Sequence, residues 1–363
     1  MADKDELRIP VAALEDFVTR IFAAAGCDAE ESSRVARYLV AANLTGHDSH
    51  GVVRVPRYVG MLRDGGVVAG RVVEVVSENG AMAVVDGRMG LGQTVAPQAV
   101  GIGIAKALAG GCAVIALRNA GHIGRVGDWA EMAAARGVLS IHFVNAHGSV
   151  LVAPFGGAER RFSTAPFCVG VPRRGAAPVV LDFATSLVAE GKVLVASSGG
   201  KALPEGALIE ADGRLSTDPH TLYGPYEAVG PRDVSKGTGA IRAFGEHKGS
   251  GLAFMCEMLA GCLTAGGTSG PVSERSRIAN GMLSIFISPK HFGTQAEFER
   301  MGLIYADWVS ETRPADPAAP VLLPGEPEAT RRAERLADGV PLPPDTWANI
   351  IGTAKRLGVN SSI

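Results

Sequence analysis

The residues best suited to chemistry lie close together between positions 46 and 58. Within thirteen residues, this segment combines two imidazoles, a hydroxyl, a carboxylate, two guanidiniums and a phenol, a mixture that packing alone does not require. An arginine can hold a carboxylate through two parallel hydrogen bonds, and a histidine can donate, accept or carry a proton near neutral pH. Small organic acids are therefore the first class of substrate to consider.

His50, Arg54 and Tyr58 are spaced four residues apart, so they would share one face of a helix that begins just after Gly51. On that face, Arg54 would bind a substrate carboxylate, while His50 or Tyr58 would add a hydrogen bond. The alternative is structural, with Ser49 capping the helix and Arg54 forming a surface ion pair.

A second candidate is His122, which lies in the glycine-rich segment 118–124 after a predicted strand. Ligands of α/β proteins tend to bind at loops that follow sheet strands. We therefore interpret His122 as a general acid and base, the alternative being a solvated loop histidine. The histidines without comparable surroundings are interpreted as structural, and they are His142, His147, His220 and His291.

Two further segments carry polar side chains where ligands often bind. The predicted strand in 181–186 runs into Asp182, Thr185 and Ser186. Its carboxylate could orient an imidazole or bind a ribose hydroxyl, and its hydroxyls could bind phosphate or only cap the next segment. Lys248 stands among glycines before a predicted buried helix, where free amides and the helix dipole favour an anion, although it could be merely solvated.

The composition is that of a globular protein with a large core. The chain has 363 residues, 47% of them apolar, and a formal net charge of -2, so a nucleic-acid partner is not expected. The N-terminal ten residues are charged, and no apolar stretch is long enough to cross a membrane. We expect a cytoplasmic protein with no membrane partner, whose five widely spaced cysteines are reduced core thiols.

The periodicity of apolar residues predicts an α/β chain. Helices are predicted from Val11 to a stop at Gly26, from a capping box at Asp28 and Glu31 to about Gly46, and over 96–109, 128–136, 252–266 and 328–336. Strands are predicted over 72–76, 83–85, 113–117, 139–144, 179–181 and 193–195. Asp212 and Gly213 indicate a hairpin turn, and the proline-rich stretch 314–327 indicates a connector.

Glycine is unusually frequent, with 47 residues, yet the dinucleotide fingerprint G-x-G-x-x-G is missing. The segments 90–92 and 101–103 begin like it but lack the third glycine and the preceding strand. If the chain binds a nicotinamide cofactor, it does so without a Rossmann fingerprint.

Six segments together resemble the malate/L-lactate dehydrogenase family, which is unrelated to the Rossmann-fold lactate and malate dehydrogenases. They stand in the family's order between roughly residues 10 and 355, and they are 48–58, 119–124, 153–157, 181–186, 247–249 and 323–327. One such segment would be weak evidence for the family, but six segments in the family's order are strong evidence.

The resemblance implies a non-Rossmann cofactor domain with a largely antiparallel sheet, and a helical domain formed by both chain ends. We set the helical domain at 1–75 with 320–363, and the α/β cofactor- and substrate-binding region at 76–319. The resemblance also implies NAD or NADP as cofactor, no metal, and a homodimer with its active site near the subunit interface.

Carried onto this sequence, the resemblance assigns catalysis to His122, His50 and Arg54, and substrate binding to Ser49, His50, Arg54 and Tyr58. The residues that it places along the cofactor are His122, Gly124, Asp182, Ala184, Thr185, His247, Lys248, Pro324, Gly325 and Glu326. Ala165, Ser250 and the longer segment 145–152 depart from the family pattern and could reshape the pocket.

We therefore expect an NAD(P)-dependent oxidoreductase that interconverts a small 2-hydroxy acid and its 2-oxo acid. Family members also act on ureidoglycolate, sulfolactate, diketogulonate and cyclic imino acids, so a reductase of piperideine-2-carboxylate and a ureidoglycolate-type dehydrogenase are alternatives. From other classes, a hydrolase with Ser49 as nucleophile and a cofactor-binding protein without catalysis stay open.

Overall fold

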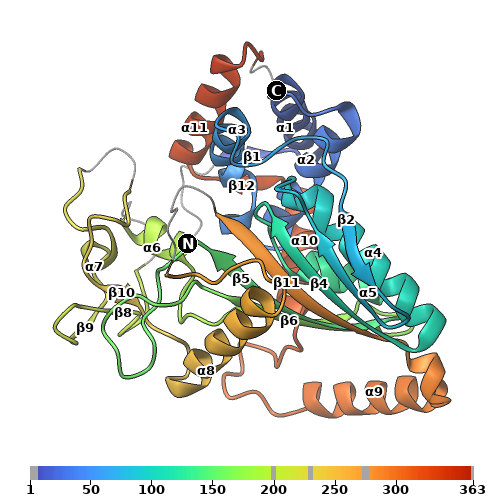
Figure 1. Ribbon diagram of the computed structural model, residues 1–363. Helices are drawn as coiled ribbons and strands as arrows, with labels where there is room; N and C mark the ends of the chain where they lie inside the picture. Colours follow the sequence, from blue (N-terminus) through green and yellow to red (C-terminus); the bar gives the residue numbers. More distant parts are fainter. Residues whose placement is uncertain (1–6, 198–201, 228–231, 272–277, 361–363) are drawn as a thin grey trace.

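The computed structural model describes residues 7–197, 202–227, 232–271 and 278–360 (Figure 1). Its largest feature is a seven-stranded sheet in the order β2-β3-β4-β11-β5-β6-β7. The strands are β2 (Glu74–Glu78), β3 (Met82–Asp86), β4 (Cys112–Ala120), β5 (Leu139–His147), β6 (Pro166–Val171), β7 (Val179–Ala184) and β11 (Ala279–Ile287). β3 and β4 run parallel, and the other neighbours run antiparallel. This sheet confirms the largely antiparallel, non-Rossmann fold.

Two helices, α4 (Gly92–Gly110) and α5 (Gly127–Ala134), pack against the sheet. They bury a continuous apolar cluster that includes Ile115, Trp129 and Phe286. The close approach of α4 needs a glycine, because a Cβ atom at Gly103 would lie 2.2 Å from the ring of Phe286. Two further helical segments, α8 (His247–Cys256) and the π-helical turn η3 (Glu257–Cys262), pack against β5.

The helical layer combines both chain ends, as expected. Near the N-terminus, β1 (Leu7–Ile9) pairs antiparallel with β12 (Val340–Leu342), which follows α10 (Glu326–Asp338). The helices α1 (Val11–Ala24), α2 (Ala29–Leu44), α3 (Val55–Arg63) and α11 (Pro344–Arg356) complete this layer at the top of Figure 1. The predicted stripe of α1 is fully buried and consists of Leu14, Phe17, Val18, Ile21 and Phe22.

The expected capping box of α2 is only half formed. Asp28 accepts a hydrogen bond of 2.7 Å from the backbone N–H of Glu31, as predicted. The buried Glu31 carboxylate instead accepts from the amide of Gly70 and the hydroxyl of Thr94, each at 2.7 Å. Glu31 therefore connects α2 to the beginning of α4.

A third group contains the small sheet of β8 (Leu208–Ile209), β9 (Leu215–Ser216) and β10 (Ala240–Ile241), with α6 (Glu190–Ser197) and α7 (His220–Tyr223) beside it. The hairpin turn at Asp212 and Gly213 is confirmed, because Gly213 has φ 89° and β8 pairs with β9. The strand expected over 193–195 is wrong, since these residues lie within α6.

Other expectations also differ from the structure. Cys112 and Cys262 are exposed rather than core thiols. The predicted buried helix corresponds to α8 and η3, but Phe254 and Met255 are exposed on it. The sequence did not predict α11, nor the segment after β11, where the short turn η4 (Pro289–Phe292) precedes α9 (Gln295–Ser310).

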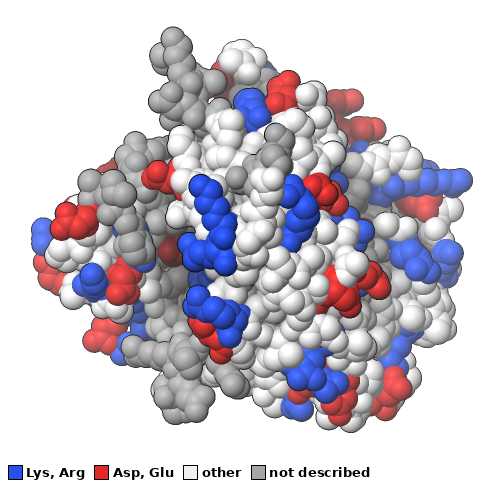
Figure 2. All heavy atoms as spheres, turned by 90° about the horizontal axis from the view of Figure 1, so that it is seen from above, with Lys and Arg blue, Asp and Glu red and all other residues white. Residues whose placement is uncertain are grey.

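In the described residues, none of the helices combines the length and apolar character that a membrane crossing requires. On the face seen from above, basic and acidic side chains are interspersed, with several basic ones near the middle (Figure 2). The domain boundaries set from the sequence stay a prediction.

Candidate active site

The loop that carries His122 is held tightly between β4 and α5. The amide of Gly121 donates to the carbonyl of Gly90 at 2.8 Å, and the amide of Ile123 donates to Asn280 Oδ1 at 2.9 Å. A Cβ atom at Gly92 would lie 2.2 Å from the His122 carbonyl oxygen, so only glycine allows this approach. The loop therefore presents the His122 ring from a fixed backbone.

Tyr58 links His122 to the helical layer. Its hydroxyl oxygen lies 2.5 Å from His122 Nδ1, and the side-chain amide of Gln93 donates to the same oxygen at 3.3 Å. The Tyr58 side chain is buried in the core of the helical layer. The phenol that the sequence assigns to the substrate is thus bound to the predicted acid–base residue.

His50 lies parallel to His122. The two ring centroids are 5.5 Å apart with an interplanar angle of 5°. The Ser49 hydroxyl lies 3.2 Å from His50 Nδ1, a contact that adjacent residues rarely make. Each ring is therefore bound at Nδ1 to a hydroxyl, and within the described ranges neither Nε2 atom has a hydrogen-bond partner.

Arg54 stands beside these rings, although not on the helix that the spacing predicts. Two short 3-10 turns, η1 (Asp48–His50) and η2 (Val52–Arg54), come first, and α3 begins at Val55. Arg54 Nε donates to the carbonyl of Ser49 at 2.5 Å. Its two terminal nitrogens have no hydrogen-bond partner in the described part of the chain, which leaves the planar fork available to a carboxylate.

Asn43, which sequence reasoning missed, fixes the turns that carry His50 and Arg54. Its buried side-chain oxygen accepts from the amide of Val52 at 2.8 Å, and its nitrogen donates to Asp48 at 2.6 Å. A Cβ atom at Gly51 would lie 2.2 Å from that oxygen, so the turn needs glycine there. Asp48 also pairs with Arg335 of α10 at 2.7 Å.

The two imidazoles are neutral in the free protein. Burial, and to a smaller extent the positive charge of Arg54, lower the pKa of His50 to about 3. Burial also holds the pKa of His122 well below its usual value, again with Arg54 as the strongest charged neighbour. A bound carboxylate would offset the charge of Arg54 and raise both pKa values.

Most of the predicted cofactor residues come together along β7, an edge strand of the large sheet. The amide of Val180 donates to the Pro324 carbonyl at 3.2 Å, and the Thr185 carbonyl accepts from the amide of Phe244 at 3.0 Å. The Asp182 carboxylate accepts from the amide of Gly127 at 2.7 Å and so caps α5. The turn 324–326 and the start of α8 thus lie near opposite ends of one strand.

The start of α8 offers side chains rather than free amides. His247 and Lys248 are exposed. The amides of Lys248, Gly249 and Ser250 already donate to carbonyls in 244–246, which corrects the expectation that free amides bind the anion there. The Lys248 ammonium, the His247 imidazole and the helix dipole still suit a diphosphate, so this edge fits a dinucleotide.

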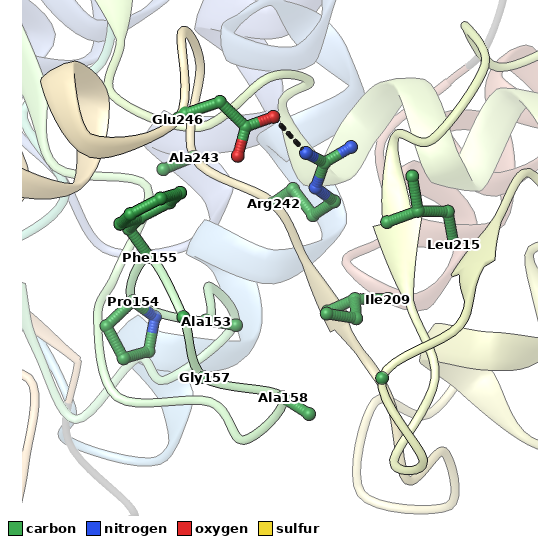
Figure 3. A pocket seen from close by; sticks show the side chains of 12 residues that line it. Ala153, Pro154, Phe155, Gly157, Ala158, Ile209, Leu215, Arg242, Ala243 and Glu246 are labelled. Atoms are coloured by element: carbon green, nitrogen blue, oxygen red, sulfur yellow. Dashed lines mark hydrogen bonds and ion pairs between the residues drawn. The ribbon is translucent and has the colours of Figure 1, made fainter.

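A cavity of about 310 Å³ lies beside α8, and its lining includes neither His50 nor His122 (Figure 3). It lies between the loop 153–158 and the small sheet, and its wall includes Phe155 and Leu215. Its charged side chains, Arg242 and Glu246, bind each other. Because that pair is already matched and none of the lining residues belongs to the histidine group, we do not assign the substrate to this cavity.

A family model described as malate/L-lactate dehydrogenase matches residues 9–351. Hydroxycarboxylate dehydrogenase B of Escherichia coli K12 is 39% identical over 97% of this chain and 95% of its own. Among solved structures, malate dehydrogenase from Pyrococcus horikoshii OT3 is 29% identical with a TM-score of 0.86, covering 99% of this chain and 98% of its own. Delta1-piperideine-2-carboxylate reductase from Pseudomonas syringae pvar. tomato is 28% identical with a TM-score of 0.78, covering 96% and 100%.

This fold and these relatives define an oxidoreductase that acts on hydroxy acids. The chain belongs to the malate/L-lactate dehydrogenase family. Membership confirms the resemblance found in the sequence and implies a nicotinamide cofactor. It also argues against the hydrolase alternative, even though Ser49 does contact the ring of His50.

Proposed function

We propose that this chain transfers a hydride between NAD or NADP and a small 2-hydroxy or 2-oxo acid of the malate or lactate type. The observation that carries the proposal is the pair of parallel imidazoles beside the guanidinium fork of Arg54. Among the residues that the structure describes, neither the Nε2 atoms nor the terminal nitrogens of Arg54 have a hydrogen-bond partner. That arrangement offers a carboxylate clamp and a proton acceptor at one place.

In the proposed reaction, Arg54 binds the substrate carboxylate and His50 adds a hydrogen bond from its free nitrogen. In the oxidation direction, His122 accepts the hydroxyl proton at Nε2 when its own ring proton lies on Nδ1, where Tyr58 Oη can accept its hydrogen bond. The lowered pKa of His122 favours the neutral ring that this step needs. In the reduction direction, the substrate carboxylate raises the pKa of His122, so that the ring can carry the proton it donates. A bound nicotinamide supplies or takes the hydride.

We propose that Ser49 and Tyr58, which the sequence assigns to substrate binding, act on the substrate indirectly. Their hydroxyls are hydrogen-bonded to the imidazoles of His50 and His122, respectively. We propose that the cofactor lies along the β7 edge, supported by the way its segments meet there. The residues proposed to hold it are His122, Gly124, Asp182, Ala184, Thr185, His247, Lys248, Pro324, Gly325 and Glu326.

The test is to oxidise a panel of 2-hydroxy acids with each cofactor and to monitor the reaction by the absorbance of the reduced nicotinamide. We expect turnover by the wild-type protein and a loss of roughly a hundredfold or more in kcat for His122→Asn, with cofactor affinity retained. His291→Asn, a change of an exposed histidine, is the matched control. No turnover of any hydroxy acid, or full turnover by His122→Asn, would contradict the proposal.

A second candidate is reduction of cyclic imino acids, favoured by the similarity to the piperideine-2-carboxylate reductase. Such a substrate also has a carboxylate beside a polarised carbon, so Arg54 and His122 would keep their roles. Reduction of a cyclic imine without turnover of any 2-oxo acid would select this candidate, and ureidoglycolate belongs in the same panel.

We also propose that the protein is a homodimer in the cytoplasm. The dimer is supported by α9, on which Met301, Ile304, Tyr305 and Trp308 are exposed at helical spacing. An exposed apolar stripe of this kind usually marks a protein interface.

A further inference from the structure

The acid–base histidine rests on two buried polar side chains from different layers. Tyr58 and Gln93 are 2% and 1% exposed, respectively. Tyr58 Oη lies 2.5 Å from His122 Nδ1 and 3.3 Å from Gln93 Nε2. The Gln93 amide oxygen is buried and, within the described ranges, has no hydrogen-bond partner. Burying an unpaired amide oxygen costs stability, so Gln93 is not explained by packing alone.

The single hydroxyl hydrogen of Tyr58 links Gln93 to the tautomer of His122. A phenol has one hydrogen to donate and two lone pairs to accept with. When the Gln93 amide donates to one lone pair of Oη, two arrangements are possible. The phenol hydrogen can go to His122 Nδ1, which puts the ring proton on Nε2, or to the His122 carbonyl oxygen 3.4 Å away, which leaves the second lone pair to accept from Nδ1–H. When an acceptor at position 93 takes the phenol hydrogen, Oη accepts from Nδ1–H and leaves Nε2 free as a base.

From this geometry we infer that Gln93 is a positioning residue that sets, through Tyr58, which nitrogen of His122 carries the proton. The inference rests on the proposed function for its catalytic consequence, but the tautomer can be measured separately. Gly124 and Gly92 support it, because a Cβ atom at Gly124 would lie 2.9 Å from Gln93 Nε2 and one at Gly92 would meet the His122 carbonyl. The three side chains therefore have little room to separate.

Three variants test the inference. Gln93→Met removes the amide at similar volume, Gln93→Glu leaves only acceptor atoms when ionised, and Tyr58→Phe removes the linking oxygen. Gln98→Met is the matched control, since Gln98 lies on the same helix and binds the backbone of Val73 instead. We expect Gln93→Met and Tyr58→Phe to lower kcat roughly tenfold to hundredfold, with KM for the acid within about threefold.

The pH profile of activity distinguishes control of the His122 proton from a general loss of rigidity in the active site. The charged and titratable groups acting on His122 are Arg54, His50 and Arg57. Tyr58→Phe removes the acceptor for Nδ1–H of the imidazolium, so the acidic limb of kcat/KM for oxidation should move to lower pH. Gln93→Glu makes Oη a better acceptor and adds negative charge, so that limb should move to higher pH. General loosening would not produce opposite shifts.

The nitrogen NMR spectrum of ¹⁵N-histidine-labelled protein reports the tautomer without any turnover, with His122 assigned by His122→Asn. We expect Gln93→Glu to increase the Nδ1–H form and the effect to disappear in the Tyr58→Phe background. If wild-type turnover is confirmed but the Gln93 variants keep its kcat, pH profile and tautomer, the inference is wrong and the function stands. If wild-type protein turns over nothing, the function fails, and the tautomer spectra alone decide the inference.

Discussion

At the scale of single residues, the guanidinium of Arg54 is fixed by a hydrogen bond at Nε, which leaves its two terminal nitrogens to bind a ligand. Its Nε is bonded to the Ser49 carbonyl, which fixes the direction of the guanidinium plane. The terminal nitrogens remain unbonded in the described chain. A rigid fork loses little conformational entropy when it binds a carboxylate, and a lysine at this position would lack both the fork and the anchoring bond.

We therefore predict that Arg54→Lys raises KM for the hydroxy acid roughly tenfold to hundredfold, while KM for the cofactor changes little. Steady-state kinetics with each substrate varied in turn measures both values. Arg63→Lys is the control, because Arg63 is an exposed arginine at the end of α3 that pairs with Asp64. An unchanged KM for the acid in Arg54→Lys would remove Arg54 from carboxylate binding.

The sequence identified the individual residues of the site better than their contacts. His50, Arg54 and His122 could be singled out because imidazoles and a guanidinium near glycines are unusual for packing. The contact of Tyr58 with His122 spans 64 positions, and only the tertiary structure shows it. Gln93 gave no signal, because one amide in an apolar helix is common, although it directly follows the glycines of 90–92.

At the scale of secondary structure elements, β5 contains a buried histidine in the middle of the sheet. His142 Nδ1 lies 2.8 Å from the Ser284 hydroxyl, and Nε2 lies 3.0 Å from the Ser140 hydroxyl. Burial lowers the pKa of His142 from 6.5 to about 3. The unfolded chain therefore takes up this proton first, so folded stability falls as the pH drops from about 6.5 towards 3.

We predict that His142→Gln, whose amide can still bond both serines, loses less stability in acid than the wild-type protein. The difference between pH 7 and pH 4.5 should shrink by roughly 2 to 3 kcal/mol, because each pH unit below the unfolded pKa costs on the order of 1 kcal/mol. Urea unfolding at one protein concentration measures it. The exposed His291→Gln should retain the wild-type acid sensitivity; equal sensitivity in all three proteins would contradict the assignment.

Elements with one apolar face were predictable, whereas those shaped by distant contacts were not. The five apolar residues of α1 repeat on one face, and all are buried. In α9, further apolar residues lie outside the stripe of Met301, Ile304, Tyr305 and Trp308, and Gly302 interrupts the helix, so the sequence periodicity did not reveal it. The valines at 193 and 195 favour a strand locally, yet tertiary contacts place them in α6, with Val193 buried and Val195 exposed.

At the scale of the whole molecule, α9 lies at the lower edge of the view in Figure 1. Its apolar stripe of Met301, Ile304, Tyr305 and Trp308 is exposed. Tyr305 and Trp308 stack on each other, with ring centroids 5.9 Å apart, and both are 67% exposed. Aromatic side chains dominate the buried centres of protein interfaces. From the family resemblance, we propose that a second copy of this chain covers this stripe.

We predict that the wild-type protein has twice the chain mass of 37.5 kDa in light scattering at micromolar concentration. Trp308→Glu combined with Ile304→Glu should reduce the mass to that of one chain, because two charges would have to be buried in the interface. Val72→Glu, at an exposed apolar position outside α9, should leave the mass unchanged. A wild-type protein of single-chain mass would exclude α9 as a dimer contact.

The pairing of β1 with β12 has a consequence for how the enzyme is made. Translation produces Leu7–Ile9 long before the strand that pairs with it, Val340–Leu342. The layer that buries Tyr58 shares its apolar cluster with Val340, Leu342 and Ile350. A growing chain therefore cannot complete the apolar cluster around Tyr58, the residue that supports His122, until these later residues have been added.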